Sequence, residues 1–230
     1  MSHFLDRPIW NALSTRQLEF SAGDDFARRF LPDIGPLAGV ADESERSLAS
    51  LSEIVPREGS LLLFQKDPIK LPPGIKAETT TFGVQMMGDK FVPVAGEIEN
   101  SLELLKETDT AEMVALAKLT KPGPFETGTR RLGDFWGIKI DGRLAAMAGT
   151  RMRHEGYCEI SGVCVHPDFR GRGYARSLSA AMARRILDRG EIPYLHAYAS
   201  NTSAVKLYES LGFRTRVSLH VAVLARETRG

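Results

Sequence analysis

The sequence predicts an α/β (α+β) fold in which a mixed, mostly antiparallel twisted sheet is flanked by helices. Three strand-like segments, at 135–140, 144–152 and 157–165, follow one another across short turns, which indicates an antiparallel meander. A helix-like segment at 171–189 then leads into a further strand at 192–199, so a helix crosses over between strands. This order predicts one sheet with helices on its faces.

Local signals support each element of this second half. Asp141-Gly142, at the first turn of the meander, is a strong hairpin signal. Before the meander, the four residues from Asp109 to Glu112 have the pattern of a capping box that opens a helix. The helix after the meander ends at Gly190. It has one apolar face, with residues four apart: Leu178, Met182 and Ile186.

A shorter helix is predicted after the strand at 192–199. Asn201 is a suitable N-cap for it, and Gly212 ends it. A last strand is predicted at 217–225. Apolar residues recur on one face of this helix at helical spacing: Ala204, Leu207, Tyr208 and Leu211.

The first half of the chain is less clearly patterned. Asp42-Glu43-Ser44 indicates a helix start, and the segments at 60–65 and 77–87 have the composition of strands. We therefore predict two parts, an N-terminal α/β segment at 1–96 and a C-terminal domain at 97–230.

The composition narrows the classes of partner. The 230 residues have a formal net charge of +1, which provides no long-range field for nucleic acid or an anionic membrane, so we expect neither as a partner. Cys158 and Cys164 lie too far apart along one predicted strand for a disulfide, so we expect reduced thiols. With no long apolar run and no signal-peptide pattern, we expect a cytoplasmic protein.

The most informative segment joins the third strand of the meander to the long helix. Two arginines and two glycines stand where that helix begins. Unpaired backbone N–H groups and the positive end of the helix dipole make such a position suitable for phosphate, and glycine lets the backbone approach the anion closely. The segment does not match a P-loop, which needs Lys after Gly173, nor a dinucleotide turn, because Arg176 stands where Gly or Ala is required.

A third phosphate pattern, Arg-x-x-Gly-x-Ala, is matched by Arg170, Gly173 and Ala175. Here the segment resembles the coenzyme A loop of the GNAT superfamily of N-acetyltransferases. A second signature of the same superfamily follows, Asn-x-x-Ala-x-x-Leu-Tyr-Glu-x-x-Gly-Phe, which begins at Asn201 and ends at Phe213. The resemblance covers residues 97–230. The layout with an extra N-terminal part resembles glycine N-acyltransferase-like members. Two readings of the first segment therefore stay open: a degenerate GNAT-like half, or a part that covers the sheet edge or shapes the acceptor pocket.

The resemblance implies acetyl-CoA as cosubstrate and no metal. It also implies a β-bulge near Val163, which would free backbone groups of the third strand for the pantetheine arm and let the Val163 N–H polarise the thioester carbonyl. The residues expected to bind the cosubstrate are Val163, Cys164, Val165, Arg170, Gly171, Arg172, Gly173, Tyr174, Ala175 and Asn201.

Two residues are predicted to be catalytic. By resemblance, Tyr208 points at the coenzyme sulfur and acts as general acid; the alternative is a core tyrosine, because Tyr208 also falls on the apolar face. Glu159 is the expected base, as in several family members with a glutamate at this spacing from Arg170. Its alternatives are a solvent-facing side chain or an ion pair with Arg151 or Arg153 across the hairpin.

The predicted function is transfer of an acetyl group from acetyl-CoA to a primary amine by direct attack in a ternary complex. The identity of the acceptor stays open: it is a small molecule, an amino acid or a protein amine. Whether the protein forms a homodimer also stays open. The alternatives are a catalytically silent acyl-CoA sensor and a dinucleotide-binding enzyme.

Two further sets of residues bear on the site. The first is a competing pair, Cys164 and His166, which would form a thiol nucleophile with its base if the two side chains met. The second lies in the loop at 119–131, which we expect beside the acceptor. There Glu126 could bind an ammonium group, and Arg130 and Arg131 could bind a carboxylate.

Overall fold

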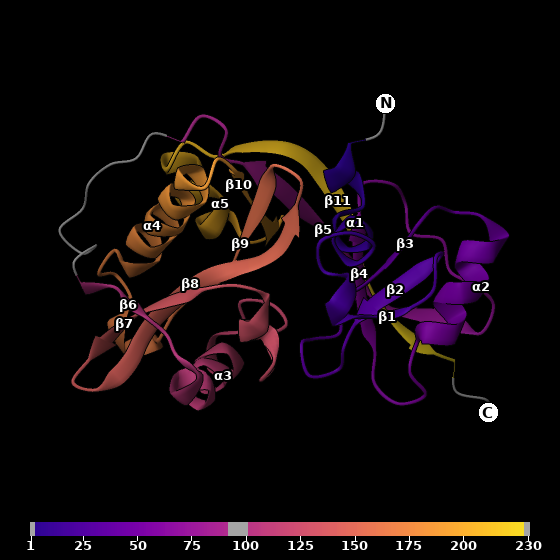
Figure 1. Cartoon of the computed structure of the whole chain (residues 1–230), viewed down its shortest axis with the longest axis horizontal. Coiled ribbons are helices and arrows are strands. Elements are labelled where there is room, and N and C mark those ends of the chain that lie inside the picture. The colour runs from indigo at the N-terminus through magenta and orange to yellow at the C-terminus, as the bar shows by residue number, and fades with distance from the viewer. Residues whose placement is uncertain (1–2, 92–100, 228–230) are drawn as a thin grey trace.

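The computed structural model describes residues 3–91 and 101–227 (Figure 1). Within these residues the strands form an eight-stranded sheet and a small three-stranded sheet. The order across the large sheet is β4 (Leu61–Gln65), β11 (Arg214–Arg226), β5 (Ile75–Met87), β10 (Ile192–Tyr198), β9 (Tyr157–Val165), β8 (Arg143–His154), β7 (Phe135–Ile140) and β6 (Glu103–Leu104). The small sheet contains β1 (Ser21–Gly23), β2 (Ala27–Phe30) and β3 (Ala38–Val40). The α-helices are α1 (Pro8–Leu13), α2 (Glu45–Ile54), α3 (Thr110–Thr120), α4 (Tyr174–Asp188) and α5 (Thr202–Ser210).

The large sheet is mixed and mostly antiparallel, as predicted. Among the described strands, β9 and β10 form its parallel pair, and the other neighbours run antiparallel. Helices cover both faces of the meander. Ala146 and Ala148 of β8 belong to the core cluster of α4, whereas Met147 between them packs with α3, because successive strand residues point to opposite faces.

Two strands from the first half of the chain complete the sheet. β11 pairs with β5 from Arg214–Met87 to Arg226–Ile75, and β4 pairs along its other edge. In Figure 1 these long strands run from the part that holds α4 and α5 to the part that holds the small sheet. The sheet therefore crosses the domain boundary predicted between residues 96 and 97. That boundary stays a prediction, because it lies at 92–100, outside the described residues.

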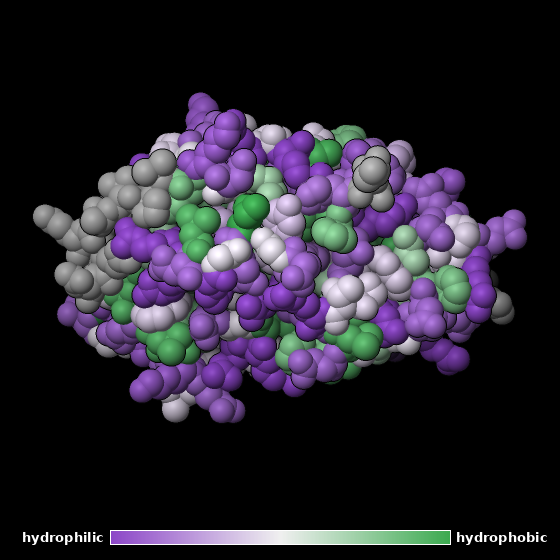
Figure 2. Space-filling view, turned by 45° about the horizontal axis from the view of Figure 1, so that its top comes forward, coloured by the Kyte–Doolittle hydropathy of each residue, from purple (hydrophilic) through white to green (hydrophobic). Residues whose placement is uncertain are grey.

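Local sequence signals account for the best-predicted elements. Asp141 and Gly142 have φ values of 50° and 76°, which are the left-handed conformations that a tight two-residue hairpin requires. The predicted apolar face of α4 is confirmed, since Leu178, Met182 and Ile186 are at most 1% exposed. Figure 2 shows a face of the molecule that carries mainly hydrophilic residues with scattered hydrophobic ones.

One predicted helix start is wrong. The helix predicted from Gly171 begins at Tyr174, because Gly171 and Gly173 both have φ of 77°, which is not helical. The start predicted at Asp109 is confirmed, since α3 begins at Thr110 with Asp109 as its N-cap residue, but the capping box expected there does not form. The Asp109 carboxylate instead accepts a hydrogen bond from the N–H of Lys106, at 2.6 Å, and pairs with Lys139 of β7, at 2.7 Å. A tertiary ion pair has replaced a local cap.

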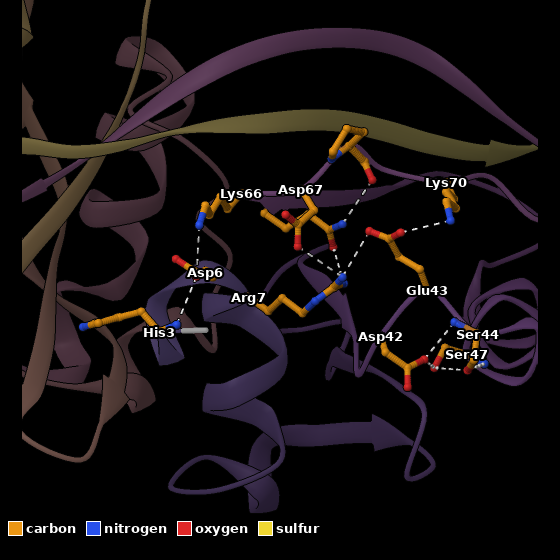
Figure 3. Close-up of polar contacts among 12 residues, drawn as sticks. His3, Asp6, Arg7, Asp42, Glu43, Ser44, Ser47, Lys66, Asp67 and Lys70 are labelled. Carbon is orange, nitrogen blue, oxygen red and sulfur yellow. Dashed lines mark hydrogen bonds and ion pairs between the residues drawn. The ribbon is translucent and has the colours of Figure 1, made fainter. Parts of the chain in front are cut away.

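The predicted helix start at 42–44 is confirmed and belongs to a polar network (Figure 3). Ser44 is the N-cap of α2, and its Oγ accepts a hydrogen bond from the Ser47 N–H. Hydrogen bonds from Ser44 and Ser47 lower the pKa of Asp42 to about 2. Beside them, Arg7 at the start of α1 pairs with Glu43 at 3.2 Å and with Asp67 at 3.6 Å. These contacts fix α1 and α2 against the loop after β4.

Truncation of a buried leucine of α4 should destabilise the fold far more than the same truncation at its surface. Leu178 is fully buried, so Leu178→Ala should lower the free energy of unfolding by about 2–5 kcal/mol. Leu119 of α3 is 54% exposed, and Leu119→Ala should change the free energy of unfolding by less than about 0.5 kcal/mol. Urea unfolding measures both, and similar losses for the two variants would contradict the described packing of α4.

Candidate active site

The site begins where two parallel strands diverge. β10 pairs with β9 from Ile192–Tyr157 to Leu195–Ile160, and there the pairing stops. Beyond it, β10 continues along β5, and β9 continues along β8. Within the described residues, the backbone groups of the last five residues of β9, from Ser161 to Val165, therefore have no partner strand on the β10 side. The divergence that the resemblance implied is present.

A β-bulge occurs at the same place. Between the pairs Met147–Cys164 and Gly149–Ser161, β9 has one residue more than β8. Gly162, inside this interval, has φ of 66°, which a residue with a side chain rarely adopts. The bulge expected near Val163 is thus confirmed, and it turns the end of β9 away from β10.

The turn after β9 leads directly to the N-terminus of α4. Gly171 and Gly173 are left-handed, and a Cβ at either position would meet no protein atom within 4 Å. Glycine is therefore needed for the backbone conformation and leaves the space beside the turn open. No side chain of residues 3–91 or 101–227 caps α4, so its first N–H groups face that space with the positive end of the helix dipole. This arrangement suits an anion.

A cleft of about 580 Å³ lies against this turn, and we call it the α4 cleft. Its charged lining residues are all cationic: Lys121, Arg170, Arg172 and Arg176. The Arg176 guanidinium is held by Ser210 at the end of α5, through Oγ and the carbonyl oxygen. All the residues that the sequence analysis assigned to the cosubstrate line this cleft: Val163, Cys164, Val165, Arg170, Gly171, Arg172, Gly173, Tyr174, Ala175 and Asn201.

A second cavity, of about 170 Å³, adjoins the cleft, and we call it the central pocket. The residues common to both cavities include Val163, Asn201 and Tyr208. The far wall of the pocket comes from β4, β5 and β11, through the lining residues Leu62, Phe64, Gly83, Leu219 and Val221. Strands of the first half of the chain thus complete a cavity that begins at the diverging strands.

Tyr208 lies in the wall between the two cavities. It is held on α5, which begins where Asn201 Oδ1 accepts a hydrogen bond from the Ala204 N–H, at 3.2 Å. Burial raises the pKa of Tyr208 to about 12, and a nearby Cys164 adds to the shift. Its hydroxyl neither donates a hydrogen bond to the described residues nor accepts one from them. Tyr208 is therefore protonated at neutral pH and free to donate to a ligand.

Glu159 has a different environment. It is 1% exposed and accepts two hydrogen bonds from Arg151, at 2.7 and 2.8 Å. His196 Nδ1 lies 2.7 Å from the same carboxylate, and the Met152 N–H also donates to it. Burial alone would raise the pKa of Glu159, but the charge and hydrogen bonds of Arg151 outweigh it, so the pKa is lowered.

This geometry is the cross-hairpin ion pair that the sequence left open, with Arg151 as the partner. Glu159 lines neither cavity, whereas Arg151 and His196 both line the central pocket. Burial lowers the pKa of His196, so its imidazole is neutral at neutral pH. Glu159 thus stands behind two residues of the pocket wall, and its predicted role as base remains a prediction.

The competing pair does not form in the described structure. No hydrogen bond joins Cys164 to His166, and burial raises the pKa of the Cys164 thiol to about 11, which disfavours the thiolate. Cys158 is also a buried free thiol, so the expectation of unpaired cysteines is confirmed.

The loop predicted to bind the acceptor is positioned differently from expectation. Phe125 is buried, Arg131 pairs with Asp33, and Arg130 lines a separate cavity near β6. Glu126 lines an outer groove that continues from the central pocket. The loop does reach the pocket, but through Lys121, Pro122 and Pro124.

Sequence reasoning missed several pocket residues, among them Lys121 and His196. A weak signal for Lys121 existed, since a helix ending in Lys-Pro-Gly-Pro must turn sharply there. Nothing in the sequence indicates that His196 meets Glu159, because they lie on different strands.

The described residues contain no group of three or more His, Cys, Asp or Glu side chains able to hold a metal ion. Among them, no helix has both the length and the apolar character needed to cross a membrane.

Comparison with known proteins identifies relatives. A family model described as FR47-like protein matches residues 136–221. Mycothiol acetyltransferase from Nocardiopsis dassonvillei is 36% identical over 91 residues, which are 35% of this chain and 27% of the relative. The ribosomal protein bS18-alanine N-acetyltransferase from Salmonella typhimurium is 38% identical over 77 residues, which are 33% of this chain and 51% of the relative. The matches thus span between about a quarter and a half of these curated relatives.

Solved structures extend the likeness to the first half of the chain. A tandem GNAT protein from the clavulanic acid biosynthesis pathway has a TM-score of 0.53 at 14% identity, over 89% of this chain and 79% of that one, which indicates a shared fold alone. The glycine N-acyltransferase-like layout stays a prediction. An acetyltransferase of the GNAT family from Novosphingobium aromaticivorans has a TM-score of 0.92 and is 43% identical, covering 99% of this chain and 100% of that one. Because this likeness extends over almost the whole of both chains, the protein belongs to the GNAT family of acetyltransferases.

Proposed function

We propose that this acetyltransferase transfers the acetyl group of acetyl-CoA to a primary amine while both substrates are bound. The observation that carries the proposal is the junction of the α4 cleft and the central pocket at Val163 and Tyr208. A donor in the cleft and an acceptor in the pocket would meet there. Holding the thioester and the amine together supplies a large part of the rate enhancement without a covalent enzyme intermediate.

Two features of the α4 cleft support acetyl-CoA as the donor. The turn from Arg170 to Gly173 offers backbone N–H groups and arginines to the diphosphate. The unpaired edge of β9, from Ser161 to Val165, offers amide and carbonyl groups to the amide-rich pantetheine arm. A donor extended along that edge brings its thioester to the N–H of Val163, which would polarise the carbonyl oxygen.

In the proposed reaction the amine nitrogen attacks the thioester carbon, the new C–N bond forms and the C–S bond breaks. The amine loses one proton and the departing thiolate gains one, so the charges balance. Tyr208 is the proposed acid. Since a thiol with a pKa of about 8.5 is more acidic than Tyr208, we infer that the hydrogen bond from Tyr208 to the developing thiolate provides most of the stabilisation.

We assign Glu159 a positioning role. Its carboxylate holds the Arg151 guanidinium and the His196 ring at the wall of the central pocket. A base acting from Glu159 itself would have to work through His196, because the buried carboxylate lines neither cavity. Replacement of Glu159 should therefore disturb acceptor binding and stability before it disturbs the chemical step.

The first experiment tests the donor site with two glycines of positive φ. Gly173 has φ of 77° and Gly59 of 88°, and both have open space around the Cβ position, so alanine strains the backbone at each. Gly173→Ala should weaken acetyl-CoA binding in calorimetry by at least about tenfold, because the methyl group blocks the approach of a phosphate. Gly59→Ala should bind as the wild type does. Equal affinity in all three proteins would remove the turn from the proposal.

Tyr208→Phe tests the acid. We expect kcat to fall by about 10²-fold with acetyl-CoA affinity unchanged, because one hydrogen-bond donor to the transition state is lost. With a pKa of about 12, Tyr208 stays protonated below that pH, so the loss should be constant from about pH 7 to pH 10. Tyr157→Phe, which removes a hydroxyl outside both cavities, is the control. Unchanged turnover in Tyr208→Phe would mean that Tyr208 only packs in the core and takes no part in the reaction.

Glu159→Gln separates a positioning residue from a base. It leaves the buried Arg151 charge unpaired, so the free energy of unfolding should fall by about 3–5 kcal/mol. The KM for the amine should rise more than kcat falls. Glu155→Gln, which breaks a solvent-exposed pair with Arg16, should leave the free energy of unfolding, KM and kcat almost unchanged.

The pH dependence of stability provides a second readout for Glu159. Its pKa is lowered in the folded protein, so its contribution to stability is fully present above the ordinary value of 4.5 and is lost as the pH falls further. The stability difference between wild type and Glu159→Gln should therefore shrink below that pH. A kcat loss of 10²-fold or more at unchanged KM would instead support the base.

A further inference from the structure

The central pocket has an apolar body. Leu62 and Phe64 of β4 and Leu219 and Val221 of β11 line one side of it. Gly83 of β5 also lines the pocket and is closely packed, since a Cβ there would lie 3.3 Å from the Ala197 carbonyl oxygen and 3.4 Å from Val221 Cγ2. At about 170 Å³ the pocket is smaller than the roughly 300–1,000 Å³ of sites for drug-sized ligands. It suits a small acceptor with an apolar side chain.

The charges on the pocket wall are of one sign. Among the described residues that line it, the charged side chains are Lys121 and Arg151, and no aspartate or glutamate is present. The nearest carboxylate of the mechanism, Glu159, is already engaged by Arg151. A protonated amine would find no anionic partner here, so the pocket favours the neutral amine that attack requires. An acceptor that also carries a carboxylate would be attracted.

Arg151 retains a donor for such a carboxylate. Its Nε and Nη2 atoms donate to Glu159, and Nη1 donates no hydrogen bond within the part of the chain that the structure describes. Because the Arg151–Glu159 pair carries no net charge, it would orient a bound carboxylate by hydrogen bonding and add little electrostatic attraction. The net positive charge of the pocket comes from Lys121.

Lys121 stands at a position that glycine usually occupies. It ends α3 with φ of 50° and ψ of 55°, a left-handed conformation that is unfavourable for a residue with a side chain. It lines the α4 cleft, the central pocket and the outer groove at once. A strained residue that helps form every cavity of the site points to a role in binding.

Resting on the proposed function, we propose that the acceptor is a free amino acid with an apolar side chain, whose carboxylate is bound by Lys121 and by Nη1 of Arg151. The side chain would fill the space between β4 and β11. The α-amine would face Val163 and Tyr208, where the two cavities join.

Kinetics with three related amines test this assignment: phenylalanine, phenylalaninamide and phenylethylamine, each with acetyl-CoA and a thiol-release readout. Charge-assisted hydrogen bonds to the carboxylate predict that kcat/KM for phenylalanine exceeds that for phenylethylamine by at least about tenfold. In Lys121→Gln this ratio should fall to within about threefold, through a higher KM for phenylalanine. Lys206→Gln, an exposed change on α5 outside the described cavities, should keep the wild-type ratio.

A second variant separates binding from folding. Lys121→Gly removes the same charge and relieves the left-handed strain, so it should be at least as stable as the wild type and still lose the preference for phenylalanine. Equal or better turnover of phenylalaninamide, phenylethylamine or a peptide amine by the wild type would overturn the assignment, as would a preference that survives both variants. Acetyl-CoA binding without thiol release for any amine would instead overturn the proposed function, and this inference with it.

Discussion

The site depends on the point where β9 and β10 cease to pair. Up to Leu195 and Ile160 the two strands share a parallel ladder, and beyond it each follows its other neighbour. A continuous ladder would use the backbone groups of β9 internally and leave no room for a ligand. The bulge at Gly162 and Val163 therefore converts the middle of a sheet into a wedge, with the α4 cleft on one side and the central pocket on the other.

The parts of the site that could be predicted from the sequence are those set by local backbone rules. The turn at 170–173 needs glycine because of its φ angles, Asn201 must cap α5, and Asp141-Gly142 must form a tight turn. Each of these depends on a few consecutive residues, so a short motif contains the information. Long-range competition weakens such rules, as at Asp109, whose carboxylate pairs with Lys139 thirty residues away and does not cap α3.

The pocket walls could not be predicted for the same reason. Leu62 and Phe64 meet Leu219 and Val221 only because β4 pairs with β11, across more than 150 residues of sequence. No motif indicates that pairing, and the sequence leaves open whether the N-terminal segment is a half-copy of the fold or helps to shape a pocket. In the structure its strands line the central pocket, whereas the α4 cleft is built from the two motifs. Motif-based reasoning thus describes the α4 cleft well and the central pocket poorly.

The burial of the ion pair between Arg151 and Glu159 carries a desolvation free energy that its role has to explain. Removing two charges from water is expensive, and apolar residues of similar size often stabilise a fold more than a buried ion pair does. Arg151 of the pair lines the central pocket beside the neutral ring of His196, and its Nε and Nη2 atoms donate to Glu159. If the acceptor is an amino acid, as we propose, a neutral pair would orient its carboxylate without charging the interior, and the exposed Lys121 would supply the attraction. This division of roles would let a small apolar pocket accept an anionic amino acid and still keep its amine unprotonated.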